Sequence, residues 1–279
     1  MIPDPEAEPR PPLTLEFAFT LALMAPLIHL LWFILFKRIG LQLDWSGVGM
    51  AALVAYGSLF ALCAARFRQP PARQLGLGPA PASAWLAVLC LVPSLVVSSE
   101  IDNLVKALVP PPPVPAEIVG EPPLYLVPAL AVVFVGVFPL VYDFFFRGVL
   151  QPLASARLGA VSGVTLTAVL SGFAAAFLPA LFSAGMWALV PSLCNALILC
   201  VVRQSSKSLW PAFALHSLWG VAAIAAQFEA FGLAGFDVEG AHTPGRWVAA
   251  ALALTLVGLG LCRAAARSGP DGSSNAAPG

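Results

Sequence analysis

The sequence predicts an all-α fold, a polytopic membrane helical bundle of about eight transmembrane helices. The first observation is composition, because the 279 residues are 59% hydrophobic and only 10% charged, with a mean hydropathy of +0.88. Soluble domains average about 25% charged residues, so a soluble chain of this length could not bury so much apolar surface. The second observation is a series of apolar stretches near the roughly 20 residues that a helix needs to cross a bilayer.

The apolar stretches set the expected elements in chain order. Their approximate ranges are 17–36, 46–64, 83–99, 123–142, 159–180, 183–202, 208–227 and 246–262. They predict an organisation in five parts: a disordered N-terminal tail at 1–16, the first transmembrane helices and a proline-rich loop at 17–122, a core at 123–227, a loop and the last helix at 228–262, and a disordered C-terminal tail at 263–279.

The segments between these stretches agree with that division. Residues 1–16 are rich in proline and acidic, whereas a signal peptide opens with a basic region, so we expect no signal peptide. The stretch "VPPPPVP" at Val109–Pro115 separates the third predicted helix from the fourth as a stiff, extended loop. The three predicted helices between 159 and 227 follow one another closely, so their boundaries are the least defined.

Net charge and cysteine usage limit the possible partners. The formal net charge is zero and no basic run occurs, so we expect no nucleic-acid partner, and membrane lipids are the expected surroundings. The cysteines lie in apolar stretches without any C-x-x-C pair, which is typical of small buried hydrophobic residues. We therefore expect neither a metal site nor a cofactor. These cysteines are Cys63, Cys90, Cys194, Cys200 and Cys262.

The distribution of lysine and arginine predicts the orientation, because cytoplasmic loops are enriched in both. With the N-terminus inside, the inner side holds Arg10, Arg66, Arg68, Arg73, Arg147, Arg157, Arg203, Lys207, Arg263 and Arg267, and the outer side holds Lys37, Arg38, Lys106 and Arg246. Both termini are then cytoplasmic. Acidic residues such as Glu100 and Asp102 fall in the predicted outer loops, and the composition is compatible with a bacterial inner membrane.

Few ionisable groups lie inside the predicted membrane segments. An Asp or Arg at the centre of a spanning helix costs about 2.5–3.5 kcal/mol. Asp143 and Arg147 are four residues apart and so share a helix face, where their charges can pair. They form either a structural ion pair or the charge cluster of a polar cavity. We expect His29 and Asn195 to make interhelical hydrogen bonds, whereas His216 alone favours neither structure nor function.

Several common catalytic motifs are absent from the sequence. It contains no H-E-x-x-H metalloprotease helix, no G-x-S-x-G elbow and no G-x-x-x-x-G-K-[ST] phosphate loop. A small-solute transporter remains an alternative, because charges inside the membrane also mark substrate paths. However, transporters of this length usually contain inverted repeats with broken helices, and the sequence shows no such symmetry.

The segments "YDFFFRGVLQPL", "FAAAFLP" and "SLWPAFALHSLWG" together resemble the motifs of one family, the CPBP intramembrane proteases (CAAX proteases and bacteriocin-processing enzymes). The family's first motif is E-E-x-x-x-R, which usually continues through the same arginine as F-R-G-x-L-x-x-x-L, and the chain has "YDFFFRGVLQPL" from Tyr142 to Leu153. The second motif is F-x-x-x-H, and the chain has "FAAAFLP" from Phe173 to Pro179. The third is H-x-x-x-N or H-x-x-x-D, and the chain has "SLWPAFALHSLWG" from Ser208 to Gly220. The resemblance implies a CAAX-protease-like core at 123–227 and a glutamic-type intramembrane peptidase.

The chain departs from the family at the positions to which the resemblance assigns chemistry. The glutamate that would activate water is Tyr142, and the second glutamate is Asp143. The histidine of the second motif is Phe177, and the oxyanion-stabilising asparagine of the third is Gly220. Only Arg147 and His216 are unchanged, so Asp143, Arg147 and His216 are the catalytic remnants that the resemblance implies.

These replacements predict a degenerate family member. A general base or acid contributes roughly 10²–10⁴ in rate, and loss of one oxyanion donor costs about 10²–10³. The hydroxyl of Tyr142 has a reference pKa of about 10 and is a poor base, and Phe177 cannot transfer a proton. We therefore expect a pseudoenzyme that binds a membrane-embedded or prenylated peptide, or a partner protein, through the inherited cavity. The alternative is an active endopeptidase, a hydrolase with a rearranged site built on Asp143, Arg147 and His216.

The predicted boundaries leave one geometric conflict. The fourth predicted helix places Asp143 near its cytoplasmic end, whereas counting along the fifth places Phe177 nearer the opposite end. Either the fourth helix extends well past Arg147, or the fifth begins deeper in the membrane than residue 159 suggests.

Overall fold

Every regular element in the described part of the chain is a helix, which confirms the predicted all-α fold. The computed structural model describes residues 12–40, 45–109, 131–182, 188–227, 235–236 and 241–267. The elements are α1 (Leu15–Arg38), α2 (Trp45–Ala64), α3 (Pro71–Gln74), α4 (Ala82–Leu91), α5 (Ser94–Leu108), η3 (Val132–Val137), α7 (Phe138–Asp143), η4 (Phe144–Leu150), α8 (Gln151–Leu158), α9 (Ala160–Phe182), α10 (Leu189–Ser206), α11 (Leu209–Gln227) and α12 (Gly245–Arg267). The predicted tails lie outside the described residues, apart from positions 12–16 and 263–267.

Six helices of the described chain are long and apolar enough to span a membrane. They are α1, α4 joined to α5, α9, α10, α11 and α12. Helix α2 contributes a shorter apolar segment, Gly49–Ala64, and the start of the predicted fourth span lies outside the described residues. The chain is therefore an integral membrane protein with a helical bundle, while the predicted number of eight spans is not confirmed.

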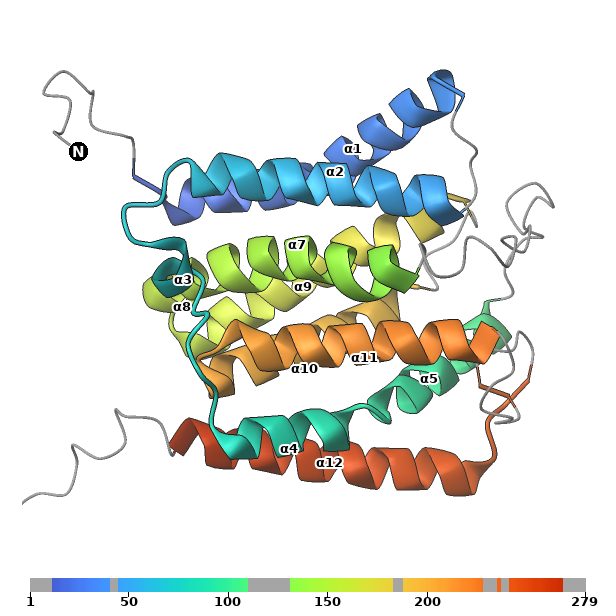
Figure 1. The fold of residues 1–279 in the computed structure, drawn as a ribbon. Coiled ribbons are helices and arrows are strands. Elements are labelled where there is room, and N and C mark those ends of the chain that lie inside the picture. Colours follow the sequence, from blue (N-terminus) through green and yellow to red (C-terminus); the bar gives the residue numbers. More distant parts are fainter. Residues whose placement is uncertain are drawn as a thin grey trace, which may run out of the picture.

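The helices pack in successive pairs across the bundle (Figure 1). Helices α1 and α2 lie against each other along one edge, and α4 and α12 pack along the opposite edge. Between these edges lie α7, α9, α10 and α11, with α10 packed on α9 and on α11. The segment that carries the first motif is thus placed in the middle of the bundle.

The fourth predicted helix continues well past Arg147, so its predicted end at residue 142 is wrong. Elements η3, α7, η4 and α8 follow one another without interruption from Val132 to Leu158, and η3 and η4 are π-helical. The helix does not need to end at its charges because Arg147 pairs with Asp143 inside the bundle. The first of the two explanations for the geometric conflict is therefore the correct one.

The third predicted span also continues further than expected. Glu100, Asp102 and Lys106, assigned above to an outer loop, lie within α5. The side chains of Asp102 and Lys106 form an i,i+4 ion pair of 2.7 Å, which supports the helix at this point. Apolar stretches therefore mark the middle of this span correctly but not its end.

Small residues allow the helices to approach closely, as is common between transmembrane helices. Ala18, Ala22 and Ala25 are fully buried on α1 and pack in the same apolar cluster as Ala52 of α2. Between α8 and α9 the approach is closer still, because a Cβ added at Gly163 would lie 2.4 Å from the backbone nitrogen of Ser155. A helix backbone cannot yield as a flexible side chain can.

We predict that Gly163→Ala destabilises the protein by about 1–3 kcal/mol, the usual cost of overpacking a filled site. The matched control is Gly57→Ala on α2, because an added Cβ there meets nothing within 4 Å and alanine favours the helix. The measurement is the midpoint of thermal unfolding in detergent micelles. Equal midpoints for the two variants would contradict the close approach of α8 and α9.

Candidate functional site

A buried carboxylate, that of Asp143, lies at the centre of the candidate site. It is the last residue of α7, and its exposed fraction is 0%. Nη1 of Arg147 donates a hydrogen bond of 2.6 Å to Oδ1 of Asp143. Because Arg147 is 1% exposed, this is a buried ion pair in which each charge compensates the other.

His216 of α11 approaches the second oxygen of the same carboxylate. Its Nδ1 lies 3.2 Å from Oδ2 of Asp143, so a proton on Nδ1 gives a hydrogen bond with the carboxylate as acceptor. The side chain of His216 is 22% exposed, which makes it the accessible member of the group. The three residues that the sequence analysis identified as motif remnants therefore lie together, although His216 is on another helix and 73 positions after Asp143.

Tyr142 lies beside this group but its hydroxyl is already engaged. The hydroxyl donates a short hydrogen bond to the carbonyl oxygen of Ser171 on α9. The ring packs against Tyr56 with centroids 4.7 Å apart and against His216 with centroids 5.9 Å apart. Tyr142 is 3% exposed, so it fills the position of the family's first glutamate with a buried aromatic ring.

The other two substituted positions are not brought into contact with Asp143 by any described interaction. Phe177 is half-buried on α9 and packs against Phe173, with ring centroids 5.7 Å apart. Gly220 is half-buried one helical turn beyond His216 on α11. Neither residue provides a side-chain group that can hold water, move a proton or donate a hydrogen bond.

Sequence reasoning missed the role of Arg203, which it assigned to an inner loop. Arg203 lies within α10 and is 8% exposed. Its Nε donates to the carbonyl oxygen of Arg147 at 3.2 Å, and its Nη2 donates to that of Leu75 at 3.3 Å. The guanidinium therefore ties the helix of the site to the connection between α3 and α4. No motif identified it, because its partners are backbone atoms distant in sequence.

A second missed contact comes from Gln151, one turn beyond Arg147. Its Nε2 donates a hydrogen bond of 2.8 Å to the carbonyl oxygen of Cys200 on α10. Gln151 is 1% exposed, so the hydrogen bond lies in the interior. Together with Arg203, it fixes the depth of the first-motif helix relative to α10.

The two remaining polar residues named from the sequence lie outside this group. His29 of α1 is buried and packs edge-on against Tyr56, with ring centroids 5.8 Å apart. The structure places Asn195 of α10 in the wall of a separate cavity. The Oδ1 atom of Asn195 is buried and accepts no hydrogen bond from the described residues, so the interhelical hydrogen bond expected for Asn195 is not made through this atom.

Comparison with known proteins identifies the region that contains this site. Residues 123–222 match the family described as type II CAAX prenyl endopeptidase Rce1-like. The matched region contains all three motifs, which confirms the resemblance inferred from them. Comparison with curated proteins gives no match, and comparison with solved structures gives none.

We predict that Arg203→Met destabilises the protein by about 1–3 kcal/mol, since hydrogen bonds from a charged donor contribute on this order. The control is Arg263→Met on α12, where the same side chain is exposed and should leave stability within about 0.5 kcal/mol. The measurement is again the thermal midpoint in detergent. If Arg203→Met unfolds at the temperature of the control, the connection from Arg147 to Leu75 contributes nothing.

Proposed function

We propose that this integral membrane protein retains the CAAX-protease-like site as a binding site and hydrolyses peptides weakly or not at all. The observation that carries the proposal is the state of the Asp143 carboxylate. One of its oxygens is bound by Arg147 and the other by His216, and its exposed fraction is 0%. A carboxylate in this position orients two side chains and is shielded from solvent by the surrounding helices.

Two groups that peptide hydrolysis requires, a general base and a donor for the oxyanion, are replaced in this chain. A general base must lie within hydrogen-bond reach of the water that it activates, and the phenol of Tyr142 is already bound to Ser171. Stabilisation of the oxyanion requires donors aimed at the developing charge, and Gly220 has no side-chain donor. Since the losses affect a single reaction, their effects do not multiply, but any one of them is large.

The matching family is described as type II CAAX prenyl endopeptidases, and this description suggests the kind of ligand. A prenylated or membrane-embedded peptide is therefore the first candidate for the bound partner, and a membrane protein is the second. His216 is the member of the group that a ligand could reach, because its side chain is partly exposed. We further propose a bacterial inner membrane with both termini in the cytoplasm.

An active peptidase with a rearranged site is the second candidate function. The observation that favours it is the convergence of Asp143, Arg147 and His216, which places a carboxylate and an imidazole 3.2 Å apart. In such an enzyme His216 would take the proton from water and Asp143 would orient the imidazole. This mechanism would still lack a donor for the oxyanion at Gly220.

We predict that the purified full-length protein binds a farnesylated peptide carrying a photoreactive group but does not cleave it. Binding is measured by crosslinking, and cleavage is measured by mass spectrometry of the peptide in detergent and in proteoliposomes. His216→Ala should reduce crosslinking. Neither the wild type nor this variant should cleave the peptide above the level of the lipid blank. Thr165→Ala on the exposed face of α9 is the control for nonspecific labelling.

Two outcomes would contradict this proposal in different ways. Wild-type turnover that disappears in Asp143→Ala or His216→Ala would establish the active enzyme instead. Crosslinking that is unchanged by His216→Ala, and unchanged when the peptide lacks the prenyl group, would contradict the proposed binding site.

A further inference from the structure

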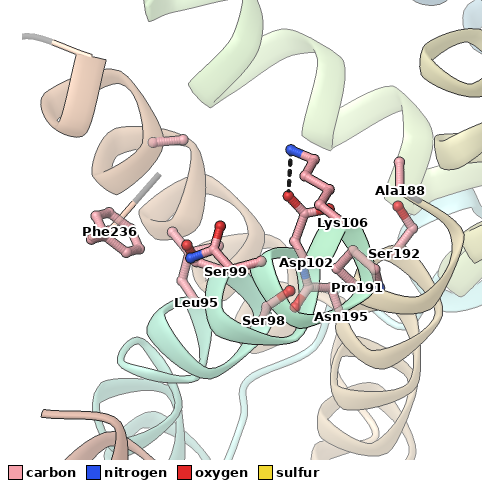
Figure 2. Close-up of a pocket in the computed structure, with 12 residues that line it drawn as sticks. Leu95, Ser98, Ser99, Asp102, Lys106, Ala188, Pro191, Ser192, Asn195 and Phe236 are labelled. Carbon is pink, nitrogen blue, oxygen red and sulfur yellow. Dashed lines mark ion pairs between the residues drawn. The ribbon is translucent and has the colours of Figure 1, made fainter. Parts of the chain in front are cut away.

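A cavity of about 300 Å³ with polar and apolar walls lies outside the candidate site, between α5, α10 and α11 (Figure 2). Its volume is at the lower end of the range for small-molecule sites. On α10, Asn195 lies five residues before Cys200, the residue bound by Gln151, which is about 7.5 Å along the helix axis. On α11, Ala223 lies seven residues after His216, which is about 10 Å along the axis. The cavity thus begins about two helical turns from the Asp143 group.

The cavity wall is neutral in charge and rich in hydrogen-bonding groups. Hydroxyls come from Ser98 and Ser99 of α5 and from Ser192 of α10. Asp102 and Lys106 also line it, and Figure 2 shows their ion pair on the α5 side. An apolar part of the wall completes the cavity, so it fits an amphipathic ligand. This apolar part consists of Leu95, Ala188, Pro191, Ala223 and Phe236.

Three atoms in the wall retain hydrogen-bonding capacity. The buried Oδ1 of Asn195 accepts no hydrogen bond from the described residues and so requires a donor. The ion pair joins Nζ of Lys106 to Oδ2 of Asp102 at 2.7 Å. An ammonium has three hydrogens and a carboxylate has two oxygens, so Lys106 can also donate to an anion and Oδ1 of Asp102 can also accept from a cation. Both side chains are partly exposed, at 32% and 25%, so a ligand can reach them.

The wall opposite α10 is held in place by hydrogen bonds to α5. Nδ2 of Asn103 donates to the carbonyl oxygen of Gly235 at 3.3 Å, next to the cavity residue Phe236. One carboxylate oxygen of Glu100 accepts from the backbone nitrogen of Thr243 at 3.0 Å, and the other lies 2.8 Å from Nδ1 of His242. These contacts hold Gly235, His242 and Thr243 against α5.

We propose that this cavity binds a zwitterionic group in which a primary ammonium lies next to an anion, as in a phosphoethanolamine lipid head group. The ammonium donates to Asn195 and to the free oxygen of Asp102, and the anion accepts from Lys106. A trimethylammonium group has no N–H to donate, so phosphocholine satisfies Lys106 but not Asn195. A soluble phosphoethanolamine shares the recognised ammonium and phosphate, but it is a phosphate monoester that lacks the glycerol and acyl chains of the lipid.

The test measures the affinity of the full-length protein in detergent for three probes by isothermal titration calorimetry. The probes are dihexanoyl phosphatidylethanolamine, dihexanoyl phosphatidylcholine and soluble phosphoethanolamine. We expect the ethanolamine lipid to bind at least tenfold more tightly than the choline lipid. Soluble phosphoethanolamine that binds as tightly as the lipid would also support the site and would identify a soluble ligand as its source.

Variants separate the contributions of the wall residues. Asn195→Leu should reduce the tenfold preference for ethanolamine to less than threefold, while Lys106→Met should weaken the binding of both lipids at least tenfold. Arg246→Met, an exposed position on α12, is the matched control and should bind as wild type does. Equal affinity of wild type for the two lipids, or no binding of any probe, would overturn the proposal. Unchanged binding in Lys106→Met would overturn it even if Asn195→Leu failed to fold.

Discussion

The buried carboxylate of Asp143 is the constraint on which the centre of this bundle depends. In a membrane interior a charge is costly, and this one is compensated by a 2.6 Å contact to Arg147 and a 3.2 Å contact to His216. The first contact lies within one helix, and the second joins that helix to α11. Because Arg203 binds the carbonyl oxygen of Arg147 from α10, the same group also connects to a third helix.

The sequence predicted the helical class and the family resemblance, because apolar length and motif spacing are local properties. It did not predict where the charged helices end. Asp102 and Arg147 each pair one turn away along their own helix, which permits a helix to continue where hydropathy falls. It also could not identify Arg203, whose partners at Arg147 and Leu75 are backbone oxygens. Contacts of this kind depend on tertiary packing and have no residue pattern.

The two polar regions of the bundle differ in how their groups are used. In the Asp143 group, both carboxylate oxygens and the neighbouring phenol of Tyr142 make hydrogen bonds to protein atoms. In the cavity beside α5, Asn195 and Lys106 retain unused capacity. The unused hydrogen-bonding groups of this cavity therefore lie on α5 and α10, apart from the Asp143 group.

A double-mutant cycle of Asp143→Leu and Arg147→Met, followed by unfolding in mixed SDS–detergent micelles, tests most directly whether the ion pair is structural. Each single variant leaves one buried charge without its partner and should lose about 3–5 kcal/mol. The double variant removes both charges and should lose less than either single variant. Single variants that unfold as wild type does would contradict the account, because the pair would then contribute nothing to the fold.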